Sequence, residues 1–372
     1  MPKIGLITYH FVLNYGAFMQ AWALQNHLIK KGFSVEIIDY KPAHLEKGGG
    51  LFFPRNKKDV KIIIYKVALN FKYLLGLFSR FRACLATTFR KAQKDEFCLS
   101  KKSYFSSEDL KGIAKNYDII ICGSDQIWNS SKQNGIDEAY FLNFVNSECR
   151  TISYAASFGR PFIEKEHWQS IERLINKIDY ISVREKSGVN LVNNLASKKA
   201  IQAVDPTLLL EYDYSNAIKP SFDLDTYAFS YTLRSQEFAK KVNAFIESTE
   251  SIKVYTMQKL KKSKIAPTPF EWIGYFKYAK YITTNSYHGT IFSIIFNKPF
   301  IFVSLEGEKA AFNERTNSLL EALGIKDRIL SSYDEAAISQ LISKEINWGE
   351  INLKLKALRK KSELFLDEAI NT

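Results

Sequence analysis

The stretch 281–303 holds the residues whose types best suit chemistry, with His288 and Gly289 at its centre. Its first residues are β-branched and aromatic, residues 285–289 are turn formers, and residues 290–297 are mostly apolar. This pattern predicts a strand, a turn and a helix, followed by a second strand. Imidazoles move protons near neutral pH, and the free N–H groups of a helix start favour anions. The sequence therefore predicts proton transfer on an anionic ligand; the alternative is that His288 only caps or packs the turn.

A second candidate site follows from the opening of the chain. Residues 3–9 predict a strand, residues 17–31 a helix and residues 35–40 another strand, with Asn14 and Gly16 in the turn between the first two. This order is typical of a parallel, doubly wound sheet, where ligands bind at the carboxyl ends of the strands. The Gly-x-Gly-x-x-Gly fingerprint is missing, so the turn does not indicate a dinucleotide. Asn14 and Gly16 serve either a ligand or simply a tight turn.

Small and polar residues follow a further buried strand, in the segment GSDQIWN that starts at Gly123. Asp125 and Gln126 could hydrogen-bond sugar hydroxyls, and Trp128 could support the face of a sugar ring. The alternative is that Ser124 or Asp125 only caps a turn.

Arg184 comes directly after a predicted strand at residues 180–183, followed by Glu185. A guanidinium at this edge of a parallel sheet is suited to a forked contact with a carboxylate or a phosphate. The alternative is a structural pairing of Arg184 with Glu185 or with a helix terminus.

The second half of the chain restarts the alternation of strands and helices, and Arg315 lies in the first turns of a predicted helix at residues 312–323. The pattern predicts strands at 227–232, 252–257, 280–284 and 299–304, and helices at 235–248 and 268–279. Arg315 is therefore expected near the same cleft as His288.

We accordingly predict an α/β protein with two Rossmann-like domains whose parallel sheets face a central cleft. The expected domains are residues 1–210, residues 211–348, and a C-terminal helix at 349–372 that packs back across both. Residues 210–225 carry acidic and turn residues and are expected to form the crossing.

The formal charge of +13 is concentrated in one segment, residues 51–94. This segment has 11 basic residues and one acidic residue, a net charge of +10 (11 − 1), so a local explanation is needed rather than nucleic-acid binding by the whole protein. Apolar residues between the charges predict one or two helices in a basic insert at about 51–95, after a triple glycine at residues 48–50. Such helices suit peripheral contact with an anionic membrane or a polyanionic glycan. The alternative is a helical pair packed on the sheet with solvated charges.

Other features of the sequence limit the class of protein. The four cysteines show no metal-ligand or Cys-x-x-Cys spacing, which favours reduced thiols in the cytoplasm. Three lysines interrupt the longest apolar stretch, residues 60–78, which argues against a membrane-spanning helix. The apolar run after Met1 is too short for a signal peptide. We expect a cytoplasmic protein, peripheral at the inner face of the membrane, that works without a metal ion.

Six short motifs, in this order, resemble the polysaccharide pyruvyl transferase family. The resemblance runs through most of the chain except the basic insert and the extreme C-terminus. The motifs are Asn14-Tyr15-Gly16-Ala17, the segment from Gly123 to Asn129, Ser153-Tyr-Ala-Ala-Ser157, Ile181-Ser-Val-Arg-Glu185, Val204-Asp-Pro-Thr207 and Ser286-Tyr-His-Gly289.

The resemblance implies a fold similar to GT-B glycosyltransferases. It also implies transfer of a pyruvate ketal from phosphoenolpyruvate, the donor substrate, to a sugar of a cell-surface polysaccharide or its lipid-linked precursor. No cofactor is implied. His288 would be the general acid and base, and Arg184 would grip the donor with Ser286, Gly289, Thr290 and Arg315. The acceptor would meet Asn14, Tyr15, Gly16, Ser124, Asp125, Gln126 and Trp128.

One position departs from the family pattern. Members of the family often carry arginine two residues before the histidine, where this chain has Ser286. Arg315 and Lys298 are the nearest candidates to supply the missing cation. Two other functions therefore stay open: a GT-B glycosyltransferase with a nucleotide-sugar donor, and a non-catalytic glycan-assembly protein.

Overall fold

The computed structural model describes residues 1–45, 57–74, 80–133, 135–145, 149–210, 216–220, 226–233, 237–262 and 266–372. The triple glycine at 48–50, Arg55 in the basic insert and most of the predicted crossing at 210–225 lie outside these residues. The chain divides into two compact units, which are described one at a time. Unit 1 contains Met1–Leu210 and Arg359–Thr372, and unit 2 contains Glu211–Leu358.

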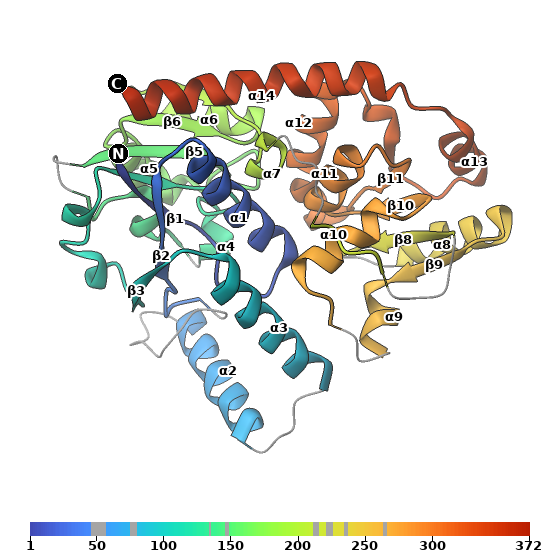
Figure 1. Cartoon of the computed structure of the whole chain (residues 1–372), viewed down its shortest axis with the longest axis horizontal. Helices are drawn as coiled ribbons and strands as arrows, with labels where there is room; N and C mark the ends of the chain where they lie inside the picture. The colour runs from blue at the N-terminus through green and yellow to red at the C-terminus, as the bar shows by residue number, and fades with distance from the viewer. Residues whose placement is uncertain are drawn as a thin grey trace. The chain divides into compact units, whose positions relative to one another are not determined.

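Unit 1 is built on a seven-stranded parallel sheet in the order β3-β2-β1-β4-β5-β6-β7 (Figure 1). Its strands are β1 (Lys3–Ile7), β2 (Ser34–Tyr40), β3 (Leu99–Tyr104), β4 (Ile119–Cys122), β5 (Arg150–Ala156), β6 (Tyr180–Val183) and β7 (Ala200–Gln202). Its helices are α1 (Tyr15–Lys30), α2 (Lys57–Leu74), α3 (Arg80–Glu96), α4 (Ser130–Gln133), α5 (Trp168–Ile175), α6 (Lys186–Leu195) and α7 (Pro206–Leu209).

The order of this sheet reverses direction between β1 and β4. The chain builds outward from β1 through β2 to β3, and then returns to place β4 on the other side of β1. In doubly wound sheets the ligand crevice lies at this switch point, outside the carboxyl ends of the two strands. The loops after β1 and after β4, which hold Asn14 and Ser124, therefore occupy the usual ligand-binding position of the fold.

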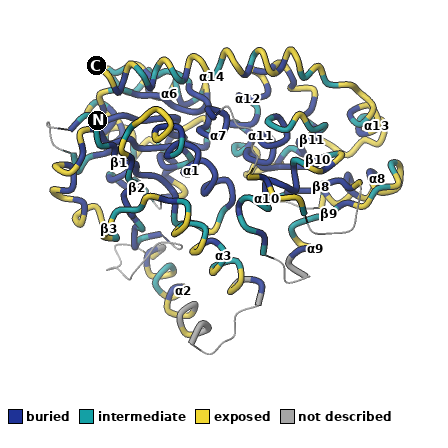
Figure 2. The backbone as a smooth tube through the Cα atoms, viewed as in Figure 1, coloured by how far each residue is buried: buried dark blue, intermediate teal, exposed yellow. Residues whose placement is uncertain are grey.

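The central strands explain why unit 1 folds as a parallel sheet. All four residues of β4, Ile-Ile-Ile-Cys, are buried, and β4 pairs with β1 so that Cys122 lies opposite Ile7. A strand that is apolar on both faces has to be covered by helices on both sides, as parallel strands usually are. Figure 2 shows the buried residues running along the strands of the sheet.

Unit 2 is built on a five-stranded sheet in the order β12-β11-β10-β8-β9, again parallel throughout. Its strands are β8 (Tyr227–Tyr231), β9 (Lys253–Thr256), β10 (Tyr281–Thr284), β11 (Phe300–Val303) and β12 (Ile329–Leu330). Its helices are α8 (Glu237–Glu250), α9 (Met257–Lys262), α10 (Pro269–Lys277), α11 (Tyr287–Ile295), α12 (Glu314–Leu323) and α13 (Glu335–Ser343). The switch point of this sheet lies between β8 and β10, and β10 leads directly into the turn before His288.

Aromatic side chains fill one side of the second sheet. Tyr231 on β8 meets Trp272 on α10 at 5.0 Å between ring centres, and Trp272 meets Phe292 on α11 at 5.2 Å, both edge-to-face. Helix α10 begins at a capping box in which Thr268 and Glu271 each accept a hydrogen bond from the other's backbone N–H. This packing holds α11 against the sheet.

Helix α14 (Trp348–Asn371) contributes residues to both units. In unit 1, the Val204 N–H donates to Ser362 Oγ at 2.9 Å, and Arg359 Nε donates to the Leu208 carbonyl at 2.8 Å. Arg150 Nη1 donates to the Ile370 carbonyl at 2.6 Å. The final turns of α14 are thus hydrogen-bonded to three separate segments of unit 1.

The predicted α/β class with two Rossmann-like domains is confirmed, and most predicted elements are present with ends that differ by a few residues. The prediction missed β3, β12, α4, α6, α7, α9 and α13. In the described part of the chain, none of the helices has the length and apolarity that crossing a bilayer requires. The facing of the two sheets across a central cleft stays a prediction.

Candidate active site

The turn between β10 and α11 is set by the side chains of Thr284 and Ser286. Thr284 Oγ1 donates to the Tyr231 carbonyl at 2.7 Å and accepts the Ser286 N–H at 3.1 Å. Ser286 is the N-cap of α11, and its hydroxyl accepts the Gly289 N–H at 3.4 Å. Ser286 therefore has a structural role at the position where the resembling family often has arginine.

Gly289 allows α11 to start against the strands. A Cβ at this position would lie 2.2 Å from Thr284 Oγ1 and 3.3 Å from the Tyr231 ring. Thr284 cannot easily move, because both of its hydrogen bonds hold the turn. The glycine of the predicted motif is thus required by packing.

His288 lies in the first turn of α11 beside Tyr287, and Arg315 contacts Tyr287. The rings of Tyr287 and His288 meet edge-to-face at 5.5 Å between centres. The guanidinium carbon of Arg315 lies 5.2 Å from the centre of the Tyr287 ring, a cation–π contact. All three side chains are largely buried, and His288 keeps 7% of its surface exposed. The structure therefore brings Arg315, as the sequence predicts, to the amino end of the helix that carries His288.

Asn313 fixes where the helix of Arg315 begins. Its side chain accepts the Leu305 N–H at 3.0 Å and donates to the Leu305 carbonyl at 2.8 Å and to Ser304 Oγ at 2.9 Å. These contacts tie the start of α12 to the loop after β11, which neighbours β10 in the sheet. Arg315, two residues later, is consequently held at the carboxyl edge of the sheet.

Lys298, the other candidate cation, lies at the wrong end of α11. It follows the last turn, and its N–H donates to the Ser293 carbonyl at 2.8 Å. The helix between it and His288 is about 13 Å long, and its carboxyl end carries the negative pole of the dipole. Burial lowers the pKa of Lys298. Arg315 is the better replacement for the arginine that is missing at Ser286.

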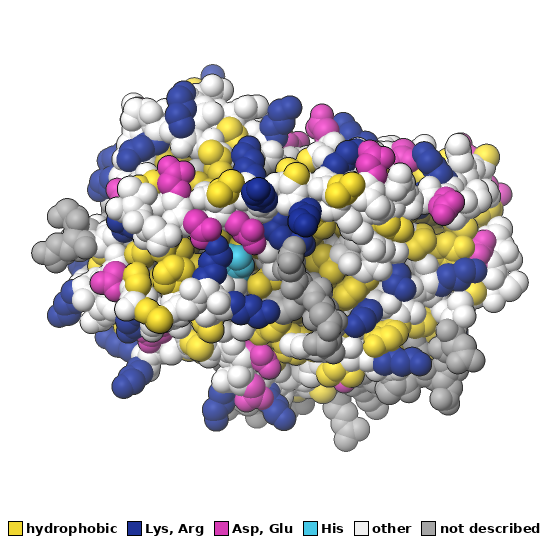
Figure 3. All heavy atoms as spheres, turned by 45° about the horizontal axis from the view of Figure 1, so that its top comes forward, with side chains coloured by type: hydrophobic (Ala, Val, Ile, Leu, Met, Phe, Trp, Pro, Cys, Tyr) yellow, Lys and Arg dark blue, Asp and Glu magenta, His cyan; other side chains and the backbone are white. Residues whose placement is uncertain are grey.

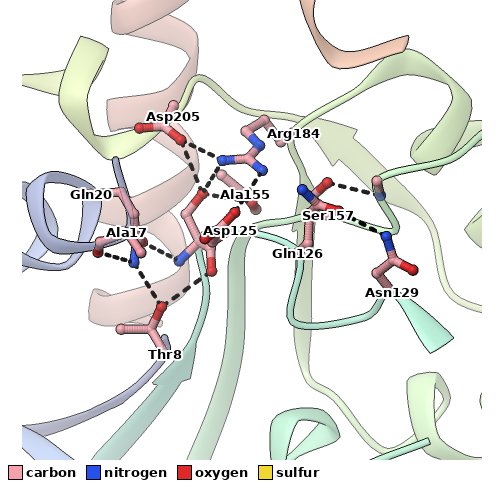
Figure 4. Close-up of polar contacts among 12 residues, drawn as sticks. Thr8, Ala17, Gln20, Asp125, Gln126, Asn129, Ala155, Ser157, Arg184 and Asp205 are labelled. Atoms are coloured by element: carbon pink, nitrogen blue, oxygen red, sulfur yellow. Dashed lines mark hydrogen bonds and ion pairs between the residues drawn. The ribbon is translucent and has the colours of Figure 1, made fainter. Parts of the chain in front are cut away.

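In unit 1, Arg184 is bound by carboxylates rather than presented to a ligand (Figure 4). Its Nη1 donates to Asp205 Oδ2 at 2.6 Å and to Ser124 Oγ at 3.4 Å, and its Nη2 lies 3.5 Å from Asp125 Oδ1. Its side chain is 1% exposed. Two neighbouring carboxylates neutralise the guanidinium, so this geometry favours a positioning role for Arg184 over the predicted direct grip on the donor.

Asp205 links this ion pair to the start of α7. Its Oδ1 accepts the Thr207 N–H at 3.0 Å and the Thr207 hydroxyl at 2.6 Å, which caps the helix. Asp205 was part of a quoted motif, but the sequence did not predict its pairing with Arg184. Arg184 lies 21 residues away from Asp205 and follows a different strand, and no local pattern indicates their contact.

The loop after β4 is tied to the loop after β1 through Ser124. The Ser124 N–H donates to Gln20 Oε1 at 3.1 Å, and its carbonyl accepts the Thr8 hydroxyl at 3.2 Å. Gln20 Nε2 in turn donates to Thr8 Oγ1 at 3.0 Å. Gly123 precedes this point at φ +121°, and a Cβ there would lie 2.1 Å from the Tyr154 carbonyl oxygen. Thr8 and Gln20, which sequence reasoning missed, thus hold the two edges of the switch point together.

Five of the seven predicted acceptor residues fall into two groups. Asn14 caps α1 by accepting the Ala17 N–H at 3.0 Å, the Tyr15 ring packs 4.9 Å from that of Phe89, and Gly16 is buried. These three residues shape the turn. Asp125 and Gln126 keep partial exposure at the carboxyl edge, with Gln126 Oε1 accepting from Asn129 Nδ2 at 2.8 Å. Asp125 and Gln126 are the better placed to meet a ligand.

Trp128 occupies the core, against the prediction that it supports a sugar. Its indole is 2% exposed and stacks on Phe141 at 5.0 Å with an angle of 4° between the ring planes. Its Nε1 donates to the Tyr140 carbonyl at 2.9 Å. Both the ring face and the polar atom are therefore used in packing within unit 1.

His10 and Asp39 form a buried pair next to the switch point that the sequence prediction did not include. His10 Nε2 lies 2.7 Å from Asp39 Oδ1, and Lys41 and Ser103 also contact this carboxylate. Burial acts to raise the pKa of Asp39, but the hydrogen bonds from His10, Lys41 and Ser103 outweigh it and hold the pKa well below its usual range. The pair joins the loop after β1 to β2, and Ser103 connects it to β3; His10 is 1% exposed, which favours a structural role.

Neither metal-binding clusters nor disulfides appear in the described residues. No group of three or more His, Cys, Asp or Glu side chains there lies where it could hold a metal ion. The cysteines Cys84, Cys98, Cys122 and Cys149 are free. Metal independence itself stays a prediction.

Fold and site together define a two-unit α/β protein with a histidine at one switch point and a carboxylate-bound arginine near the other. The chain belongs to the polysaccharide pyruvyl transferase family, whose model matches residues 14–307. It is therefore an enzyme of that family by descent. No curated protein matches the chain.

Solved structures show the same fold at low sequence identity. S. aureus MnaA in its co-structure with UDP has a TM-score of 0.51 at 10% identity, covering 100% of this chain and 97% of its own. A mutant of S. aureus TarM in complex with fondaparinux, alpha-GlcNAc-glycerol and UDP has a TM-score of 0.52 at 10% identity, covering 100% and 99%. UDP-GlcNAc 2-epimerase from Neisseria meningitidis, bound to UDP-GlcNAc, has a TM-score of 0.50 at 9% identity, covering 100% of both chains. These likenesses support the predicted GT-B-like class.

Proposed function

We propose that this protein transfers a pyruvate ketal from phosphoenolpyruvate to a sugar of a cell-surface polysaccharide or of its lipid-linked precursor. One observation carries the proposal: within the family-matched region, His288 lies in the first turn of α11, with the guanidinium of Arg315 against the neighbouring Tyr287. A proton-transfer group and an anion-binding helix start thus lie together at the switch point of unit 2.

The donor is an anion with a phosphate and a carboxylate. The positive end of the α11 dipole and the guanidinium of Arg315 supply positive potential for one of these groups. His288 in the same turn is then next to the enol carbon. Lys298 takes no part, because it lies beyond the opposite end of the helix.

Each step of the proposed reaction has a place for its proton. His288 protonates the methylene carbon of phosphoenolpyruvate, which becomes a methyl group and leaves positive charge on the adjacent carbon. A sugar hydroxyl attacks that carbon and gives up its proton to His288. The bond to phosphate then breaks with its electron pair on the phosphate oxygen. A second hydroxyl of the same sugar attacks the same carbon and closes the ketal, and the departed phosphate takes up its proton.

The acceptor is proposed to meet the loop after β4 in unit 1. Asp125 and Gln126 keep partial exposure there, and carboxylate and amide groups suit sugar hydroxyls. Arg184 contacts both Asp125 and Ser124 and holds them in position, and Asp205 in turn holds Arg184. Arg184 is therefore proposed as a positioning residue.

Thermal shift and mass spectrometry test the reaction. Phosphoenolpyruvate is expected to raise the melting temperature, because it binds only the folded protein. A candidate glycan incubated with the enzyme and phosphoenolpyruvate should gain the mass of one ketal while phosphate is released. Absence of both stabilisation and phosphate release would remove phosphoenolpyruvate as the donor.

Replacing His288 tests the proton-transfer role. His288→Ala should lower phosphate release by at least about a hundredfold, the usual contribution of general acid–base catalysis. The matched control is His167→Ala, at a partly exposed position beside Glu166 in unit 1. Both variants should melt close to the wild type. Retained turnover in His288→Ala would exclude this residue from the mechanism.

A nucleotide-sugar glycosyltransferase is the second candidate function. It is favoured by the fold likeness to the MnaA and TarM structures, both of which contain UDP. The same helix start would then bind a diphosphate. Stabilisation by UDP and none by phosphoenolpyruvate would support this function.

A further inference from the structure

Helix α2 presents an apolar stripe to solvent. Val60, Ile64, Val67 and Phe71 are 43%, 62%, 52% and 61% exposed. Their spacing of four, three and four residues places them within an arc of about 60° around the helix. Large apolar side chains scattered singly on a surface are ordinary, but a contiguous row of four indicates an interaction surface.

The residues beside this stripe are basic. Lys57 and Lys61 are exposed and fall next to the stripe on the same side of the helix. The one acidic residue of α2, Asp59, is buried on the opposite side, where Lys66 also lies and donates to the Ala43 carbonyl at 2.5 Å. Lys66 therefore does not belong to the exposed basic surface. The outward side of α2 combines apolar side chains with positive charge.

Helix α3, which follows α2 in the chain, is fastened to α1 of unit 1. The Phe89 ring packs against Tyr15 of α1 at 4.9 Å and against Phe18 at 6.2 Å. Trp22 Nε1 donates to Glu96 Oε2 at 3.0 Å. Exposed Arg90, Lys91 and Lys94 add positive charge on α3. Figure 1 shows α2 extending away from the sheet of unit 1, and Figure 2 shows its exposed residues.

The concentration of charge identifies the partner. On the face shown in Figure 3, lysine and arginine alternate with aspartate and glutamate. Residues 51–94, in contrast, have 11 basic residues against one acidic residue. A polyanionic glycan would satisfy the charges but would leave the apolar stripe in water. An anionic bilayer satisfies both, since its headgroups attract the lysines and its acyl boundary accepts the apolar side chains.

We propose that α2 binds the surface of an anionic phospholipid bilayer, with Val60, Ile64, Val67 and Phe71 inserted at the headgroup boundary and Lys57 and Lys61 on the headgroups. The stripe spans about 16 Å along the helix axis. The helix lies in the plane of the surface and does not cross it. This binding is independent of the reaction proposed for unit 2.

Vesicle co-sedimentation of the full chain tests this surface. The wild type should pellet with vesicles of phosphatidylcholine mixed with phosphatidylglycerol, should stay in solution with phosphatidylcholine alone, and should be released by salt. Lys57→Gln/Lys61→Gln should weaken binding about thirtyfold, the equivalent of ~1 kcal/mol for each lysine. Ile64→Ser/Phe71→Ser should weaken it by at least as much, because the inserted groups are lost.

Matched controls exclude general effects of charge or hydrophobicity. Leu353 and Leu364 on α14 are 70% and 59% exposed, so Leu353→Ser/Leu364→Ser removes similar apolar surface elsewhere. Lys101→Gln/Lys102→Gln removes two exposed lysines from β3. Both control variants should bind vesicles as the wild type does. Melting temperatures of all variants report whether each has folded.

Three results would overturn the proposal. The first is absence of wild-type binding to anionic vesicles. The second is full binding by Ile64→Ser/Phe71→Ser together with binding to soluble heparin, which would indicate a purely electrostatic surface for polyanions. The third is a wild-type dimer in light scattering that becomes a monomer in Ile64→Ser/Phe71→Ser, which would assign the stripe to a second copy of this chain.

Discussion

Ser286 and Arg315, which are far apart in sequence, both lie at the amino end of α11. Ser286 caps α11 where family members often have arginine, and Arg315 supplies a guanidinium at the same helix end from α12. A serine cap satisfies a backbone N–H, and the distant arginine supplies the charge. Under the proposed function, Arg315 takes the place of the arginine that the motif lacks.

Replacing the two candidate cations separates them. Arg315→Met should raise the KM for phosphoenolpyruvate at least about tenfold, because a charge-assisted contact is worth about 1.5–3 kcal/mol. Lys298→Met should leave the KM within about twofold, since Lys298 lies past the other end of α11. Steady-state phosphate release at varied phosphoenolpyruvate measures both. The reverse result would place the donor at the carboxyl end of the helix.

The Arg184–Asp205 pair makes a second residue-level prediction. Arg184→Met removes the cation beside the buried carboxylate of Asp205, so the free energy of unfolding should fall by about 3–5 kcal/mol. The control, Arg173→Met, removes the exposed pair of Arg173 with Glu138 and should cost at most about 1 kcal/mol. Urea unfolding compares them.

The double variant Arg184→Met/Asp205→Asn distinguishes charge burial from lost packing. It also removes the buried carboxylate and should recover part of the stability that Arg184→Met loses. If the double variant is no more stable than the single one, the loss comes from packing around Arg184 and not from the buried charge.

Among the elements, α11 depends most on a single small residue. Gly289→Ala places a Cβ 2.2 Å from Thr284 Oγ1 and should lower the free energy of unfolding by about 1–3 kcal/mol. Gly349 near the start of α14 is the matched control, because its nearest neighbour to a new Cβ is 3.5 Å away. Gly349→Ala should leave stability unchanged or slightly raised. Equal losses would refute the packing argument.

Elements that have a strong apolar pattern, or that are bounded by turn-forming residues, could be predicted from sequence, and others could not. The strands β5 and β6 and the turn before α11 belong to the first kind, because small or polar residues next to them in the sequence mark their ends. Strand β3, Leu-Ser-Lys-Lys-Ser-Tyr, is polar because it lies at the sheet edge, and nothing local distinguishes it from a loop. The sequence predicted that Trp128 supports a sugar ring. Its burial against Phe141 depends on tertiary packing, which the local sequence does not show. Arg315 was predictable from its helix start, whereas the Asp205 partner of Arg184 was not.

For the molecule as a whole, buried His27 predicts a loss of stability in mild acid. Burial, assisted by Lys31, lowers the pKa of His27 to about 4. The unfolded chain takes up this proton near pH 6.5 and the folded chain does not, so stability falls as pH drops through this window. Between about pH 7.5 and about pH 5 this residue should account for a loss of about 2 kcal/mol.

His27→Gln should flatten that dependence. Melting temperatures measured across this pH range compare the variant with the wild type, and His167→Gln is the control because His167 is partly exposed. An unchanged slope in His27→Gln would assign the acid sensitivity to other groups.

Unit 1 is discontinuous, and this has a consequence for biosynthesis. A ribosome delivers the seven strands of its sheet long before residues 359–372, which hydrogen-bond to Val204, Leu208 and Arg150. Until all of unit 2 has been translated, these three residues lack their hydrogen-bond partners on α14. Unit 1 therefore cannot complete its folding before unit 2 has been synthesised. A fragment expressed as residues 1–210 alone would likewise lack the helix that covers these three positions.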